Sequence, residues 1–190
     1  DFSTEATGFA VGNNAFYKTT DAGLSWSRIP TVTPGWQNAV RFADESRGWV
    51  CGVGGGLAQT DDGGVTWVPV STGTTQTLGR IFVLDRDHVW VTGLNGAMLH
   101  TANGGVTWDS QVTGVTTGSD VCFVDAYRGY LVAGSGVARQ TWDAGNTWVP
   151  FDVGGASADL YSLAMQTPST LWMVGMNSGN PLVVTRTEGW

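Results

Sequence analysis

Two aspartates, Asp120 and Asp159, are the residues of this sequence best placed for acid–base chemistry. Hydrolysis of a glycosidic bond by paired acids needs two carboxylates that face each other across a cleft. In the strand arrangement derived below, Asp120 and Asp159 lie on one rim in adjacent repeats, and no other two carboxylates share such positions. Because no further group supports this pair, we expect no enzymatic activity.

A sialidase-like mechanism would need three converging arginines and a tyrosine nucleophile paired with a glutamate. Tyr161 could be the nucleophile, but the glutamates Glu5, Glu45 and Glu188 lie in a lead-in, in a turn on the opposite rim and in a repeat motif. None of them is positioned to pair with Tyr161. We therefore do not predict this reaction.

Metal, nucleic-acid and membrane chemistry find no support in the sequence. His88 and His100 lack the spacing of metal ligands, so neither a metal nor a cofactor is expected. The net charge is −7 and Lys18 is the single lysine, whereas phosphate binding needs clustered positive charge. No run of 18 apolar residues is present, so we predict no membrane span.

The elements that must position these side chains follow from an internal repeat. The pattern T-x-(D/N)-x-G-x-(T/S)-W occurs four times and begins a fifth time at Thr185 to Trp190, where it is incomplete. Its leading threonines are 41, 41, 40 and 44 residues apart, and a repeat of this length indicates a repeat architecture. The full copies begin at Thr19, Thr60, Thr101 and Thr141.

Each copy of the motif has the chemistry of a tight turn. The carboxylate or amide oxygen can accept hydrogen bonds from backbone N–H groups of its own turn, and the glycine can adopt a positive φ. The tryptophan is expected to pack between neighbouring sheets. We interpret these residues as structural, because a motif present in every repeat is poorly suited to a single active site. They are Asp21, Asp62, Asn103, Asp143, Trp26, Trp67, Trp108 and Trp148.

Short apolar segments between the motifs predict three strands before each turn and one after it. Val40, Ile81, Val121 and Leu163 occupy one register of the first strand, which indicates one apolar face with a period of two. Four-stranded units of about 40 residues indicate an all-β fold, a β-propeller with antiparallel blades. We expect one domain, 1–190, with blades near 1–30, 34–72, 76–113, 117–153 and 158–190, of which the first and last are incomplete.

The motifs resemble the Asp-box (BNR) repeat of β-propellers. Together with the G-W-x-x-G type segments, such as Gly48 to Gly52, they are most similar to the photosystem II stability/assembly factor family and its bacterial relatives. This resemblance covers residues 7 to 190. It implies a non-enzymatic scaffold that is periplasmic or in the thylakoid lumen and docks peripherally on a membrane protein complex of the photosynthetic reaction-centre type. The alternative is a carbohydrate-active or glycan-binding Asp-box propeller of the sialidase or xyloglucan-hydrolase type.

Propellers usually bind at the mouth of their channel, so partner-binding residues are expected on the rim opposite the Asp boxes. In the predicted strand arrangement this rim carries mostly polar side chains, and we expect a protein partner, not a small-molecule substrate. The candidates are Trp36, Asn38, Arg80, Asp120, Asp159 and Tyr161, with Gln37, Asn95 and Asn177 nearby.

Two further expectations concern the chain as a whole. Both ends look cut, and we favour part of a six- or seven-bladed ring over a closed five-bladed one. Cys51 and Cys122 fall at different positions of units two repeats apart, so they are predicted to be unpaired and packed as small apolar residues.

Overall fold

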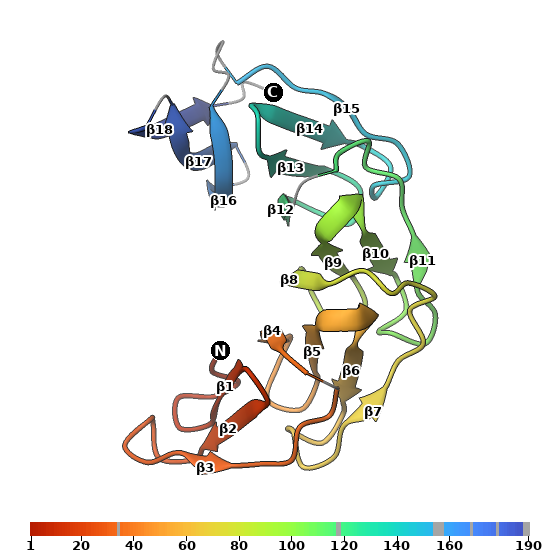
Figure 1. Cartoon of the computed structure of the whole chain (residues 1–190), viewed down its shortest axis with the longest axis vertical. Helices are drawn as coiled ribbons and strands as arrows, with labels where there is room; N and C mark the ends of the chain where they lie inside the picture. The colour runs from red at the N-terminus through yellow and green to blue at the C-terminus, as the bar shows by residue number, and fades with distance from the viewer. Residues whose placement is uncertain (34, 117–118, 154–157, 168, 178, 188–190) are drawn as a thin grey trace.

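The chain folds into five antiparallel sheets arranged as an open arc (Figure 1). The structure is a computed structural model, and it describes residues 1–33, 35–116, 119–153, 158–167, 169–177 and 179–187. These residues contain strands and two short 3-10 turns, η1 (Val53–Gly55) and η2 (Leu94–Gly96), and no α-helix. The predicted all-β propeller architecture is confirmed, whereas a closed five-bladed ring is not what this chain forms.

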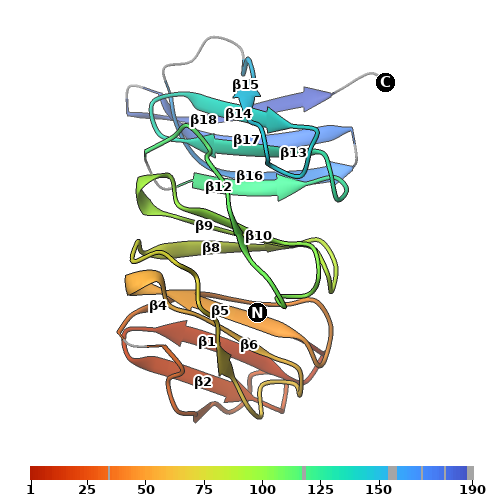
Figure 2. The same cartoon turned by 90° about the vertical axis from the view of Figure 1, so that its right-hand side faces the viewer.

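Three sheets have the four strands that the repeat predicted, and the two end sheets have three strands. Figure 2 shows the five sheets following one another along the arc. The first sheet contains β1 (Gly8–Gly12), β2 (Ala15–Thr19) and β3 (Ser27–Arg28). The second contains β4 (Gln37–Phe42), β5 (Gly48–Gly52), β6 (Leu57–Thr60) and β7 (Val68–Pro69).

The remaining sheets repeat this order. The third contains β8 (Leu78–Val83), β9 (Val89–Gly93), β10 (Met98–Thr101) and β11 (Asp109–Ser110). The fourth contains β12 (Ser119–Phe123), β13 (Gly129–Ala133), β14 (Val137–Thr141) and β15 (Val149–Pro150). The last contains β16 (Asp159–Thr167), β17 (Thr170–Asn177) and β18 (Asn180–Thr187). In the fifth motif, Thr185 and Thr187 belong to β18, while Glu188, Gly189 and Trp190 lie outside the described residues.

The first sheet has no full inner strand, but the N-terminal segment takes its place. No full strand precedes β1, but Asp1 and Phe9 exchange two backbone hydrogen bonds, and Phe2 forms an isolated bridge with Gly8. The segment before β1 therefore occupies the edge where the other sheets have an inner strand.

The inner strands pack on both of their faces, which corrects the expectation of a single apolar face. In β4, Val40 joins a cluster with Phe9 of the first sheet, whereas Ala39 packs against the cluster that contains Ile81 of the third sheet. A strand between two neighbouring sheets has no solvent-facing side, so alternate residues bury in opposite directions.

The Asp boxes have the predicted turn chemistry. In the second sheet, Asp62 Oδ1 accepts a hydrogen bond from the Thr66 amide at 2.8 Å, and Thr66 Oγ1 donates to Asp62 Oδ2 at 2.6 Å. Thr60 Oγ1 donates to Asp62 and accepts from the Gly64 amide, while Gly64 has a φ of 72°. These hydrogen bonds, first those from Thr66, lower the pKa of Asp62 to about 2. The box is therefore a self-contained turn.

The boxes also fasten neighbouring sheets to each other. Lys18 Nζ, in the first sheet, donates to the Gly63 carbonyl in the box of the second sheet at 2.9 Å. Trp90 Nε1 and Gln111 Nε2, in the third sheet, both donate to the Ala144 carbonyl in the box of the fourth, at 3.1 and 2.8 Å. In each case a side chain of one sheet donates to a backbone carbonyl in the box turn of the next sheet.

The aromatic core lies between sheets, as the repeat predicted for Trp67. Its ring contacts Phe9, Phe16 and Phe42 at centroid distances of 5.3 to 6.1 Å. Trp26 differs, because it is 39% exposed and contacts Phe2 at the end of the arc. Both cysteines, Cys51 and Cys122, are buried and unpaired, as expected.

Candidate functional site

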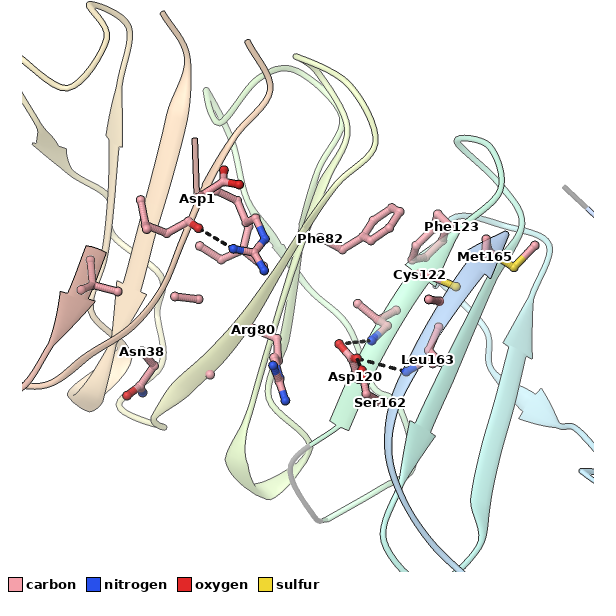
Figure 3. A pocket seen from close by; sticks show the side chains of 18 of the residues that line it. Asp1, Asn38, Arg80, Phe82, Asp120, Cys122, Phe123, Ser162, Leu163 and Met165 are labelled. Atoms are coloured by element: carbon pink, nitrogen blue, oxygen red, sulfur yellow. Dashed lines mark hydrogen bonds between the residues drawn. The ribbon is translucent and has the colours of Figure 1, made fainter. Parts of the chain in front are cut away.

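The inner strands enclose a cavity of about 790 Å³ on the concave side of the arc. Its walls come from β1, β4, β8, β12 and β16, so each of the five sheets contributes one strand to the cavity. Figure 3 shows that its two ends differ in chemistry. Most polar side chains gather at one end, and aromatic and apolar ones gather at the other, toward which Asp1 also lies. The polar end is formed by Asn38, Arg80, Asp120 and Ser162, and the apolar end by Phe82, Phe123 and Met165.

Three of the inner strands carry a bulge at the polar end of the cavity. The pairing of β4 with β5, of β8 with β9 and of β16 with β17 skips one residue each time. The skipped residues are Asn38, Gly79 and Tyr161, which occupy equivalent positions of the repeat. A bulge re-aims the side chain next to it, so these positions project toward the cavity mouth instead of into a sheet interface.

Glycines opposite the bulges make this geometry possible. A Cβ atom at Gly52, Gly93 or Gly175 would collide with the backbone carbonyl of the residue before the neighbouring inner strand or at its start. Those carbonyls belong to Trp36, Thr77 and Asp159. These glycines, in the second strands of the second and third sheets and in β17 of the last, thus permit the close approach that a bulge requires.

Arg80 is the free cation of the cavity. Its side chain is exposed and takes part in no hydrogen bond or ion pair with the residues that the structure describes. Arg41, also in the cavity wall, donates from Nη1 to the Val40 carbonyl at 2.9 Å. An unpaired guanidinium in a concave site is suited to bind a carboxylate or to stack on an aromatic ring.

Asp120, which lines the cavity as Asp1 does, is held in place by its neighbours. Asp120 Oδ2 accepts hydrogen bonds from Ser162 Oγ at 2.6 Å and from the Leu163 amide at 3.2 Å. These bonds join β12 to β16. Asp120 therefore ties two sheets together at the cavity wall, in addition to contributing a negative charge beside Arg80.

The structure brings together four of the six residues predicted for the mouth. Asn38, Arg80 and Asp120 line the main cavity, and Tyr161 lines an adjoining pocket together with Asn38 and Arg80. Trp36 is 56% exposed and pairs through its backbone with Asn13, outside both cavities.

Asp159 does not face Asp120 across the cavity. It lines neither the main cavity nor the adjoining pocket, and its Oδ1 accepts a hydrogen bond from the Ser135 amide in the turn after β13. The paired-acid arrangement is therefore not assembled at this site.

The residues named as neighbours of the mouth also lie outside the cavity. Gln37 is 2% exposed, and its side chain is buried instead of presented at the mouth. Asn95 lies in η2 and donates from Nδ2 to Gln76 Oε1 at 2.6 Å. Asn177 lines neither the main cavity nor the adjoining pocket.

Sequence reasoning missed Ser162, Gly79 and the apolar end of the cavity. Ser162 occupies the repeat position of Arg80 and Asp120, so reading down that column of the repeat would have found it. Gly79 gives no signal by itself, because a glycine in a strand indicates a bulge only when its partner strand is known. Phe123 and Met165 lie two residues after Val121 and Leu163, so alternation alone places them on the apolar face of their strands.

The arginines at the opposite rim are engaged in ion pairs. Arg47 pairs with Asp61, Arg86 with Asp44 and Arg128 with Asp125, at 2.6 to 2.7 Å. At the mouth, by contrast, Arg80 has neither an ion-pair nor a hydrogen-bond partner among the described residues.

Neither a metal centre nor a membrane helix occurs in the described part of the chain. No three residues among its histidines, cysteines, aspartates and glutamates group closely enough to hold a metal ion. No helix there has the length and apolar character needed to cross a membrane.

Comparison with protein families supports the resemblance suggested by the Asp boxes. The model of the family described as photosynthesis system II assembly factor YCF48 matches residues 28–116. This match confirms the resemblance over the second and third sheets and the start of the following loop. A search of the curated proteins gave no match.

Solved structures share the fold at low sequence identity. A structure described as YCF48 bound to D1 peptide is 16% identical with a TM-score of 0.52, covering 99% of this chain and 90% of that one. YCF48 from Cyanidioschyzon merolae is 17% identical with a TM-score of 0.70, covering 96% and 66%. An ancestral GH74 enzyme is 16% identical with a TM-score of 0.77, but this chain spans 27% of its length while 94% of this chain is covered. These likenesses establish the propeller-type fold.

Proposed function

We propose that this chain is a non-enzymatic scaffold that binds an extended protein segment in the cavity on its inner face. The observation that carries this proposal is the unpaired Arg80 at the polar end of a cavity whose other end is apolar. Such a site offers charged groups, among them Arg80 and Asp120, next to a broad apolar surface, which suits recognition of a peptide. Of the two aspartates that the sequence suggested as a catalytic pair, Asp120 lines this cavity and Asp159 does not.

The partner that we propose is a membrane protein complex of the photosynthetic reaction-centre type. The family match over residues 28–116 and the YCF48 structure described with a D1 peptide support this choice. The chain would act outside the cytoplasm, in a periplasm or a thylakoid lumen, as a peripheral accessory or assembly subunit.

Binding of D1 segments tests the proposal directly. Fluorescein-labelled peptides that tile the extramembrane segments of D1 are titrated with the purified chain, and anisotropy is measured. We expect at least one segment to bind, and Arg80→Glu to weaken that binding about tenfold or more through charge repulsion. Because Arg80 is exposed and unpaired, this variant should change the free energy of unfolding by less than about 0.5 kcal/mol.

The matched control is Arg28→Glu. Arg28 is an exposed arginine on β3 that donates to the Asn14 carbonyl, away from the cavity. It carries the same charge reversal and should leave peptide affinity unchanged. Absence of binding to every D1 segment, or equal losses in both variants, would refute the proposed site.

A carbohydrate-binding function is the second candidate, and the fold shared with GH74 enzymes favours it. Release of reducing ends from xyloglucan, or retention on a xyloglucan column, would support it. Asp120 is one of two aspartates that line the cavity, so Asp120→Asn should then lower that activity.

A further inference from the structure

A second cavity of about 300 Å³ adjoins the polar end of the main cavity. The two share Asn38, Gly79 and Arg80, and the smaller one extends between the beginning of β8 and the side chain of Tyr161. Its remaining walls come from Thr92 and Gly93 at the end of β9, from Leu94 at the start of η2, and from Thr77. This volume is at the lower end for ligand sites, so it suits one large side chain better than a whole ligand.

The pocket exists because Gly79 occupies a bulge position that carries a side chain elsewhere. The equivalent residues of β4 and β16 are Asn38 and Tyr161. Gly79 has no positive φ, and a Cβ atom built on it would meet nothing closer than the Thr92 carbonyl at 3.9 Å. Neither backbone strain nor crowding therefore requires a glycine here, and the missing side chain leaves open space beside Arg80.

The walls of the pocket combine apolar surface with a free charge. Tyr161 is 52% exposed and Leu94 is 49% exposed, so both present apolar surface without a covering partner. The guanidinium of Arg80 lines the same space and is unpaired among the described residues. An aromatic ring can pack against Tyr161 and Leu94, while a carboxylate next to it reaches Arg80.

We infer that this pocket is a specificity subsite that takes an aromatic side chain of the bound segment, with an adjacent carboxylate paired to Arg80. This inference rests on the proposed function, since it concerns which segment the cavity accepts. The carboxylate can come from an acidic side chain or from a C-terminus, because both present the same two oxygens to the guanidinium. Gly79 is the residue that determines specificity.

Peptides that differ at one position test the subsite. The probes are acetyl-Gly-Ala-Phe-Asp-amide and acetyl-Gly-Ala-Phe as a free acid, each with a counterpart in which Ala replaces Phe. Their affinities are measured by NMR titration of the isotopically labelled chain. We expect the Phe peptides to bind about tenfold more tightly than the Ala peptides, from burial of the ring. Whichever Phe peptide binds more tightly identifies the source of the carboxylate.

Filling the pocket should remove this preference. Gly79→Leu places a side chain in the open space and should reduce the preference for Phe to less than about twofold. Gly12→Leu is the matched control, because a Cβ there meets nothing within 4 Å and Gly12 lines neither cavity. Tyr161→Ala removes a wall from the other side and should also reduce the preference, which keeps the test independent of how Gly79→Leu folds.

The outcomes separate the subsite from the proposed function. A preference for Phe that survives both Gly79→Leu and Tyr161→Ala would overturn the subsite. So would binding of D1 segments by a chain that does not distinguish the Phe and Ala peptides, and the scaffold proposal would then stand. A chain that binds neither D1 segments nor these peptides would overturn both.

Discussion

The two rims of the arc use the same kinds of residue in opposite ways. At the Asp-box rim, Asp62 bonds to its own turn, and Arg47 and Arg86 are paired with aspartates. At the cavity mouth, Arg80 has no such partner within the described structure, and Tyr161 is half exposed. The residues of the box turn satisfy one another, whereas Arg80 and Tyr161, which differ between units, remain available for a partner.

The largest expected effect comes from breaking an interface between sheets. Trp90 is fully buried, stacks on Phe123 at a centroid distance of 3.5 Å and donates to the Ala144 carbonyl. Trp90→Ala should lower the free energy of unfolding by about 3 to 5 kcal/mol. Urea denaturation followed by tryptophan fluorescence measures this change.

The control for this variant is the equivalent tryptophan of the last sheet. Trp172 is 40% exposed and bonds to Gln166 of its own sheet. Trp172→Ala should cost about 1 kcal/mol or less. Equal losses in the two variants would show that the interfaces between sheets do not dominate stability.

An intermediate effect is expected from acid. The pKa of Asp21 and that of Asp62 are lowered to about 2 by hydrogen bonds, first from Ser25 and from Thr66 respectively. A carboxylate whose pKa is depressed in the folded state stabilises the protein above its unfolded pKa of about 4. That contribution should disappear as the pH falls from about 4 through 2, which urea midpoints at pH 5, 3 and 2 would reveal.

The third box supplies an internal comparison for this pH dependence. In this box Asn103 stands in place of the aspartate, and its Oδ1 accepts a hydrogen bond from the Thr107 amide. Because a side-chain amide does not titrate, this box should not respond to acid. Asp62→Asn should therefore lower stability at pH 5 and flatten the pH profile, while Asn103→Asp should steepen it. A profile that neither substitution alters would remove the boxes as the source of acid sensitivity.

The smallest effect is expected from a surface ion pair at the box rim. Arg86 Nη1 lies 2.6 Å from Asp44 Oδ2, and its side chain is 52% exposed. Arg86→Glu should lower the free energy of unfolding by about 1 kcal/mol or less, because exposed pairs are screened by solvent. Peptide affinity should stay unchanged, in contrast to Arg80→Glu. A loss of affinity here would mean that the binding surface extends to the box rim.

The fold was predictable because its signals are local and repeated. The strands Gly48–Gly52, Val89–Gly93 and Val137–Thr141 can be read from the sequence, since their runs end at glycines or lead into a box. The turn chemistry of Asp62 was predictable for the same reason. Packing of Ala39 and Val40 in opposite directions was not, because alternation shows a period and does not show what covers each face.

The site was predictable only in part, for a geometric reason. Strict alternation along β4, β8 and β16 cannot place residues at a bulge, where the pairing gains one residue. Gly79 was therefore missed, and Asp159 was assigned to the mouth although it bonds to the turn after β13. The lack of a partner for Arg80 depends on distances between sheets, which the sequence does not contain.

The hydrogen bonds from one sheet to the turn carbonyl of the next couple the unfolding of neighbouring sheets. The Ala144 carbonyl is held by Trp90 and Gln111, so opening of the third sheet releases the box turn of the fourth. In an array of repeats, stability depends on contacts between nearest neighbours. When one unit unfolds, the adjacent unit therefore loses these hydrogen bonds and becomes less stable. Amide hydrogen exchange should therefore be slowest in the second to fourth sheets and faster toward both ends of the arc, because the end sheets have a neighbour on one side only.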